Sequence, residues 1–155
     1  MNWLTSTLML LFHTPPAPHT TPNYLIVAQQ VSGYVRSENA FENLCGLLEN
    51  GQLEGILKKN RTPQGTWTTS ERVHDLISPE ERTKVIELLK QAKAGPFSQG
   101  PATCDGGTLK IFGRISPDAP FPVVNSPDCA PSSLNGSAAA PEIEKWVYAH
   151  CKFTL

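Results

Sequence analysis

Four cysteines constrain this chain more than any other feature of its sequence. They are Cys45, Cys104, Cys129 and Cys151, and no two of them form a CxxC pair. Zinc ribbons and thioredoxin-like redox sites both use cysteines spaced that closely. Widely spaced cysteines in an even number are instead typical of disulfides in an oxidising compartment. We therefore expect one or two disulfides in a secreted or periplasmic protein, with no metal and no cofactor.

The first 22 residues differ in character from the rest of the chain. They hold a short apolar stretch, Met1–Phe12, and then four prolines, and the first charged residue of the whole chain is Arg36. Such a stretch near an N-terminus is typical of a secretory signal, although a basic start and a small-residue cleavage site are missing. The prolines favour an extended chain. We interpret residues 1–22 as a signal-like or disordered leader and residues 23–155 as one domain.

The charge balance bears on the class of partner. Thirteen basic and 14 acidic residues give a formal charge of −1. This balance argues against a protein that binds nucleic acid by attraction to phosphates. No apolar run approaches the roughly 18 residues that a membrane helix needs. We expect neither a nucleic-acid partner nor a transmembrane segment in the mature domain.

Strand patterns occupy the first half of the domain. Tyr24–Val31 and Thr66–Leu76 are rich in β-branched and aromatic residues, which predicts strands. Between them, Phe41–Lys59 has Asn50-Gly51 near its centre. This pair favours a type I′ hairpin, because both turn residues there need positive φ. The alternative is a helix over the first part of this segment that ends at Gly51.

The clearest helix signal begins at Ser78. Ser78 supplies an N-cap, Pro79 suits the first helical position, and Glu81 suits the third. Apolar residues then recur at helical spacing and give one buried stripe, and Gly95 marks the end. The pattern predicts a helix over Pro79–Ala94.

The last third of the chain is rich in proline, which predicts stiff loops at Pro96–Pro101 and Pro117–Pro131. Thr108–Ile115 alternates apolar and polar residues and predicts a half-buried strand, with Phe121–Asn125 returning beside it. Pro141–Cys151 predicts a short closing helix. The fold class is therefore α+β: an antiparallel sheet packed against one main helix, a short C-terminal helix and loops stabilised by disulfides.

This hairpin suggests one disulfide pairing. Folding Thr108–Ile115 back on Phe121–Asn125 brings Cys104 roughly opposite Cys129, and directly opposed strand residues have Cα separations of about 4.5–5.5 Å. The alternative is Cys129–Cys151, which would tie the closing helix to the loop. Cys45 would pair with whichever cysteine remains, or stay a buried thiol.

No catalytic signature surrounds any serine, such as a nucleophile elbow. A nucleophilic Cys–His pair is an open alternative, because such pairs meet in space and not in sequence. His74 and His150 are the candidate bases within the domain. We name no catalytic residue and favour a non-enzymatic protein.

Aromatic residues are the candidate contacts with a partner. Phe97, Phe112 and Phe121, together with Trp67, form an exposed patch under this hypothesis and belong to the core under the alternative. Phe112 shares its strand face with Lys110, so it is the best candidate for exposure. Stiff proline-rich loops also suit recognition, because they lose little entropy on binding.

The order of motifs resembles known proteins over roughly Tyr24–Cys151. A strand ending in Ser-Gly and an Asn-Gly hairpin precede Leu76-Ile77-Ser78-Pro79-Glu80-Glu81, and a Cys-Asp-Gly strand, a further cysteine and a terminal helix follow. This layout resembles small bacterial secreted or envelope α+β proteins. More distantly, it is similar to the emfourin-like inhibitors of thermolysin-type metalloproteases. No inhibitory residue carries over, because the cysteines and the proline-rich loops depart from the inhibitor pattern.

Together these features predict a non-enzymatic secreted or periplasmic module that binds another protein, with a protease or an envelope component as candidate partners. The alternatives are a small hydrolase that uses a Cys–His pair and a structural protein of the cell envelope.

Overall fold

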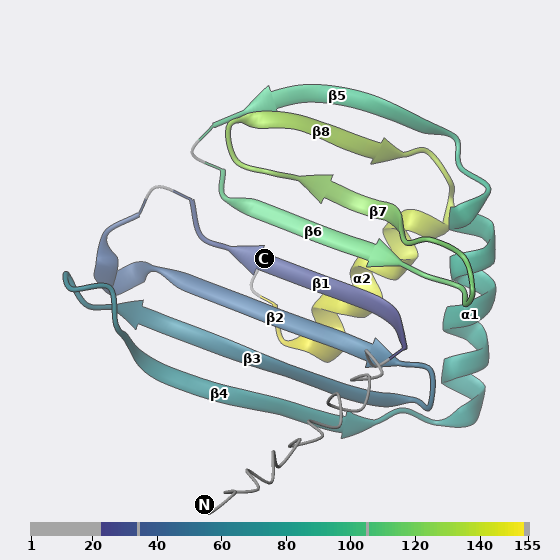
Figure 1. The fold of residues 1–155 in the computed structure, drawn as a ribbon, viewed down its shortest axis with the longest axis horizontal. Helices are drawn as coiled ribbons and strands as arrows, with labels where there is room; N and C mark the ends of the chain where they lie inside the picture. Colours follow the sequence, from purple (N-terminus) through teal and green to yellow (C-terminus); the bar gives the residue numbers. More distant parts are fainter. Residues whose placement is uncertain (1–22, 34, 105, 154–155) are drawn as a thin grey trace, which may run out of the picture.

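The computed structural model describes residues 23–33, 35–104 and 106–153, so the predicted leader lies outside the described residues. Its elements form one eight-stranded sheet and two α-helices (Figure 1). In chain order they are β1 (Tyr24–Val31), the 3₁₀ helix η1 (Ser37–Asn39), β2 (Phe41–Leu48), β3 (Gln52–Arg61), β4 (Trp67–Leu76), α1 (Pro79–Lys93), β5 (Phe97–Thr103), β6 (Thr108–Gly113), β7 (Phe121–Ser126), β8 (Ala130–Asn135) and α2 (Ala139–Cys151).

The strands pair antiparallel in the order β4-β3-β2-β1-β6-β7-β8-β5. Among the described residues, β4 and β5 are therefore the two edges of the sheet. The predicted α+β class, with an antiparallel sheet, a main helix and a short C-terminal helix, is confirmed, but the sheet is larger than the sequence indicated. Figure 1 looks onto the face of the sheet that carries no helix: α2 lies behind the sheet, and α1 is seen at the right, by the ends of the strands.

The core lies between this sheet and the two helices. From α1 it takes Val85, Leu89 and Ala92, and from α2 it takes Ile143 and Val147, all nearly inaccessible to water. The inward-facing residues of the central strands complete it: Ile26, Ala28, Cys45, Leu47, Leu53, Leu57, Ile111 and Val123. Because side chains alternate along a strand, this inward set fixes which residues face outward on the side without helices.

The turn between β2 and β3 differs from the predicted type I′ hairpin. Three residues connect the strands, and Gly51 N donates to Leu48 O at 3.0 Å. Gly51 has a φ of +89°, but Asn50 is not among the residues with positive φ. A left-handed glycine closing a three-residue loop is the second common way to make a hairpin. The hairpin itself is as predicted, and the helical alternative is wrong.

Two strands lie where the sequence predicted stiff loops. β5 takes up most of the predicted loop Pro96–Pro101, and β8 includes Pro131 from the predicted loop Pro117–Pro131. Both strands are polar and carry proline, so they lack a local strand signal. Pro101 is tolerated because β5 is an edge strand with an irregularity between Gln99 and Ala102.

The helix predicted at Pro79–Ala94 is confirmed as α1, and Ser78 Oγ accepts a hydrogen bond from Glu81 N at 3.1 Å. The Glu81 side chain binds α2 instead of the cap: its Oε1 accepts from Trp146 Nε1 at 3.0 Å and lies 2.8 Å from His150 Nε2. Glu81 therefore has two roles: its backbone N–H binds the Ser78 cap, and its side chain joins α1 to α2.

Two disulfides are present, Cys45–Cys151 and Cys104–Cys129, and no cysteine is free. The second is the pairing that the hairpin geometry suggested, although β5 and β8 do most to align it: Cys129 N donates to Thr103 O at 2.7 Å. The Cys45–Cys151 disulfide joins β2 to the last residue of α2. It therefore links the helix layer to the sheet, and neither of its cysteines lies in a loop. The alternative Cys129–Cys151 pairing is not formed.

Candidate functional site

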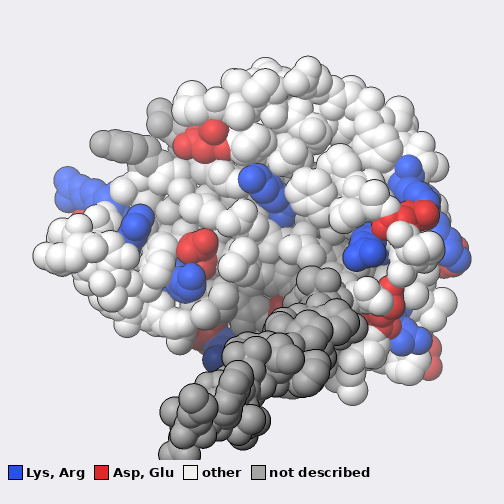
Figure 2. Space-filling view, viewed as in Figure 1, with Lys and Arg blue, Asp and Glu red and all other residues white. Residues whose placement is uncertain are grey.

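The outward face of the sheet presents side chains in rows that cross the strands. One row runs Phe112, Val27, Gly46, Glu54 and His74, and the next runs Lys110, Gln29, Leu44, Ile56 and Arg72. The apolar members are uncovered to different degrees, with Val27 46% exposed and Leu44 36% exposed. On the part of this face that Figure 2 leaves visible, uncharged residues surround separate charged patches of both signs. No helix among the described residues covers this face.

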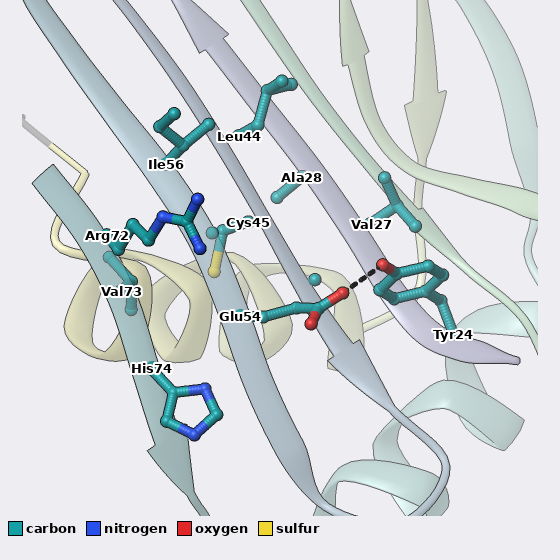
Figure 3. Close-up of a pocket in the computed structure, with 12 residues that line it drawn as sticks. Tyr24, Val27, Ala28, Leu44, Cys45, Glu54, Ile56, Arg72, Val73 and His74 are labelled. Atoms are coloured by element: carbon teal, nitrogen blue, oxygen red, sulfur yellow. Dashed lines mark hydrogen bonds between the residues drawn. The ribbon is translucent and has the colours of Figure 1, made fainter. Parts of the chain in front are cut away.

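A hollow of about 550 Å³ lies on this face over β1 to β4. Figure 3 shows its side chains: Tyr24, Val27, Leu44 and Ile56 give apolar surface, and Glu54, Arg72 and His74 bring polar groups from β3 and β4. A mostly apolar surface with a few convergent polar groups is the usual chemistry of a binding site. None of these residues is close in sequence to all the others, so the antiparallel register assembles the group.

Tyr24 and Glu54 form the one hydrogen bond drawn within the hollow (Figure 3). The Tyr24 hydroxyl donates to Glu54 Oε1 at 2.5 Å. The tyrosine ring lies over Gly46, where an added Cβ would come within 2.5 Å of ring atom Cε1. The hydrogen bond to Glu54, followed by partial burial and by the charge of Glu54, raises the pKa of Tyr24 to about 12. The pair fixes one wall of the hollow.

This hydrogen bond predicts an unusual titration. The neutral phenol is favoured in the folded state, so Tyr24 stabilises the fold below pH 10 and this contribution is lost as the pH rises from 10 towards about 12. Ultraviolet titration of the tyrosines should show a phenol that titrates near pH 12 in the wild type and is lost in Tyr24→Phe. Glu54→Gln should return that phenol towards the ordinary value. An unchanged high titration in Glu54→Gln would contradict the assigned cause.

Arg72 and His74 form the opposite side of the hollow. Both are exposed and point outward from β4, and Figure 3 shows the Arg72 guanidinium reaching across the neighbouring strand towards Ile56. Within the described residues, neither side chain has a hydrogen bond or an ion pair. An arginine without a partner above apolar surface is available to an incoming acidic group.

β4, the strand that carries Arg72 and His74, is also an open edge of the sheet in the part of the chain that the structure describes. Ile77 N donates to Gly51 O at 3.0 Å, in line with the β3–β4 register, so the odd-numbered residues of β4 direct their backbone groups towards β3. The even-numbered residues Ser70, Arg72 and His74 therefore direct theirs outward along the edge. At Leu76 the outward N–H is taken by the adjacent Asp75 side chain, at 2.8 Å. The free edge thus runs through the middle of β4.

The other edge is protected against pairing. In β5, Pro101 has no N–H, and the ladder to β8 is irregular between Gln99 and Ala102. Such interruptions are how proteins prevent an edge from accepting another strand. β4 is ten residues long, pairs with β3 in continuous register from Gln52↔Leu76 to Lys59↔Thr69, and has no proline. The pairing of the β4 edge strand is therefore continuous, whereas that of the β5 edge strand is interrupted.

The predicted aromatic contacts do not form one surface. Phe121 is 8% exposed and belongs to the core, so its assignment as a partner contact is wrong. Phe112 is half-buried on the outward face beside Val27, and Phe97 is 47% exposed at the start of β5. Trp67 is the first residue of β4. The guanidinium carbon of Arg61 lies over its ring, 5.8 Å from the ring centroid. The alternation of apolar and polar residues along β6 predicted that Phe112 faces outward, but it did not predict which strands lie beside it.

The candidate Cys–His pair lacks its nucleophile, because all four cysteines are in disulfides. His74 faces outward over the hollow, whereas Cys45 is buried and bonded to Cys151. His150 stacks on Trp146 with ring centroids 4.3 Å apart. In the described part of the chain, no three His, Cys, Asp or Glu side chains gather as a metal-binding group.

Two further hollows contain polar side chains that already bond to a neighbouring residue. One, of about 590 Å³ between α1 and α2, contains the Glu81, Trp146 and His150 group. The other, of about 920 Å³ beside η1, is lined by Gln30, whose side chain accepts from Asn43 at 3.2 Å. The hollow over β1 to β4 differs from them because it lies beside an edge strand of the sheet, β4.

Sequence reasoning did not identify Tyr24, Glu54 or Arg72 as site residues. The only local sign was alternation in the strands, which marks outward positions but not the register that brings them together. Comparison of the chain with protein-family models, with curated proteins and with solved structures found no match. None of the helices among the described residues is long and apolar enough to cross a membrane.

Proposed function

We propose that this protein is a non-enzymatic, secreted or periplasmic module that binds another protein by pairing an extended segment of it with the free edge of β4. Adding a strand to an exposed edge is an established mode of peptide recognition, in which backbone hydrogen bonds give affinity and side-chain pockets give specificity. The observation that carries the proposal is the contrast between the continuous, unblocked edge of β4 and the interrupted edge of β5.

The adjacent hollow supplies the second element of such a site. The outward side chains of β4, Arg72 and His74, line the hollow, so a segment paired with β4 lies along its rim. The apolar side chains on its floor come from strands deeper in the sheet, at Val27, Leu44 and Ile56. A side chain of the partner that reaches inward across β4 would bury apolar surface there, which is the general source of binding energy.

The two disulfides support an oxidising compartment, since such bonds persist in secreted and periplasmic proteins and are rare in reducing ones. The resemblance to emfourin-like inhibitors supports one particular partner class, a thermolysin-type metalloprotease. An inhibition titration against such a protease tests this narrower version. Failure to slow the protease removes the inhibitor function and leaves the edge-pairing module in place.

The central experiment blocks the edge without disturbing the sheet. In Ser70→Pro, the lost N–H points outward and not into the β3–β4 ladder, so the fold should survive while an added strand is excluded. Ser70→Ala is the matched control. Each variant and the wild type is used to capture proteins from the native secretome, with identification by mass spectrometry and a thermal melt as a folding check.

We expect a specific set of proteins that is captured by the wild type and Ser70→Ala and lost with Ser70→Pro. Capture that is equal for all three proteins, or no specific capture at all, would contradict pairing at β4. The second of these results would favour a structural component of the envelope without a discrete partner.

A further inference from the structure

The charged side chains on the outward face of β2 to β4 are paired, with one exception. Lys58 Nζ lies 3.4 Å from Glu42 Oε2, and Glu54 accepts a hydrogen bond from the Tyr24 hydroxyl. Arg72, in the same face and next to both, has no such partner in the described ranges. The free charge of this surface is therefore a guanidinium at the centre of the strand whose edge is open.

The position of Arg72 defines what can lie beside it. Its backbone faces outward along the edge, and its side chain stands on the outward face. A residue of an added strand directly opposite it would have its Cβ about 4.5–5.5 Å away on the same face. At that distance a carboxylate can accept two parallel hydrogen bonds from the guanidinium, which is the strongest pairing available to an exposed arginine.

The other face of β4 has the opposite character. Glu71 and Asp75 lie there, on either side of the buried Val73. Glu71 already binds Lys152 at 2.8 Å, and Asp75 accepts from its neighbour's backbone. Acidic residues of an added strand opposite these two positions would meet like charge, which destabilises strand pairing. An acidic residue is therefore favoured on one face only.

Resting on the proposed function, we propose that the bound segment is an extended peptide of another protein that carries an aspartate or glutamate opposite Arg72. Its two neighbours in sequence lie on the face of Glu71 and Val73 and are not acidic. The free guanidinium selects the register in which the segment pairs, because shifting the strand by one residue moves the carboxylate to the wrong face.

The test selects binding sequences from a displayed library of random peptides of about ten residues, the length of β4. Four proteins serve as targets: the wild type, Arg72→Glu, Lys110→Glu and Ser70→Pro. Lys110 occupies the opposite end of the same row, so Lys110→Glu makes the same change of charge away from the edge. Thermal melts check folding, and both charge variants should be close to wild type because surface changes of this kind are small.

The wild type and Lys110→Glu should select one acidic position between non-acidic neighbours, and Arg72→Glu should select a basic residue there. A peptide selected on the wild type should bind Arg72→Glu about tenfold more weakly. Ser70→Pro should select nothing. The wild type could instead select peptides that Ser70→Pro does not select and that share no acidic position. That result would overturn the acidic residue opposite Arg72 and leave edge pairing intact.

Two other outcomes are decisive. An acidic position that depends on Arg72 but survives in Ser70→Pro would overturn edge pairing, and place the carboxylate in the hollow alone. No selected peptide on any of the four targets would overturn both the acidic segment and the proposed function.

Discussion

Replacing Cys45 and Cys151 by alanine is expected to lower the free energy of unfolding by about 4.8 kcal/mol. The bond closes a sequence separation of 106 residues, and the stabilisation from a cross-link grows with the logarithm of the closed loop. Both cysteines are buried, so the alanines also leave small cavities that act in the same direction. A loss of this size is a large part of the stability of an ordinary domain.

The double variant Cys104→Ala and Cys129→Ala is the matched control. Its loop spans 25 residues, for which the same relation gives about 3.5 kcal/mol. Urea unfolding of the two variants and the wild type measures both losses. A greater loss in the Cys104 and Cys129 variant would contradict the assignment of Cys45–Cys151 as the main covalent support of the fold.

This disulfide also bears on the proposed site. Cys45 lies in β2 between Leu44 and Gly46, which both line the hollow, and its sulfur fastens the strand to α2 on the other face. Because a rigid site loses less entropy on binding, breaking the bond is expected to weaken binding as well as stability.

Replacing Gly107 by alanine is expected to cost about 3 kcal/mol, mainly because the added methyl group would clash with backbone. An added Cβ would lie 2.4 Å from Val31 O and 2.7 Å from Gly33 N, and both are backbone atoms that cannot move aside cheaply. Gly107 also has a φ of +77°, which an alanine rarely adopts. The residue sits where β6 begins its pairing with β1, at Thr108↔Val31.

Gly106 provides the control next to it. An added Cβ there meets nothing within 4 Å, and its φ is not positive. Gly106→Ala should therefore change stability by no more than about 0.5 kcal/mol in either direction. Urea unfolding of the two variants separates the effects. Equal losses would mean that the Gly107 backbone does not approach β1 as closely as described.

Elements with a strong local signal could be predicted from the sequence. The Ser78 cap, the proline after it and the apolar stripe specify α1 through contacts within a few residues. The glycine of the β2–β3 turn also acts locally, although the turn type differs from the prediction. The even number of widely spaced cysteines predicted disulfides, and the pairing Cys104–Cys129 followed from a hairpin that the structure contains.

Elements that depend on distant partners could not be predicted. β5 and β8 are polar, contain proline, and become strands only because they pair with each other and, through β7, with the rest of the sheet. Their extended conformation is stabilised by backbone hydrogen bonds across the sheet, and these leave no mark on composition. The same holds for Phe121, which the packing of the sheet against the helices buries.

The main helix, the first hairpin and the presence of disulfides can be predicted from the sequence, because short-range geometry and cysteine chemistry control them. The open edge at β4, the interrupted edge at β5 and the hollow beside Arg72 depend instead on the packing of distant segments. Among the described residues, Arg72 has no partner at that hollow. Strand order and register are properties of pairs far apart in the chain. A periodic pattern states which way a side chain faces, but not what it faces.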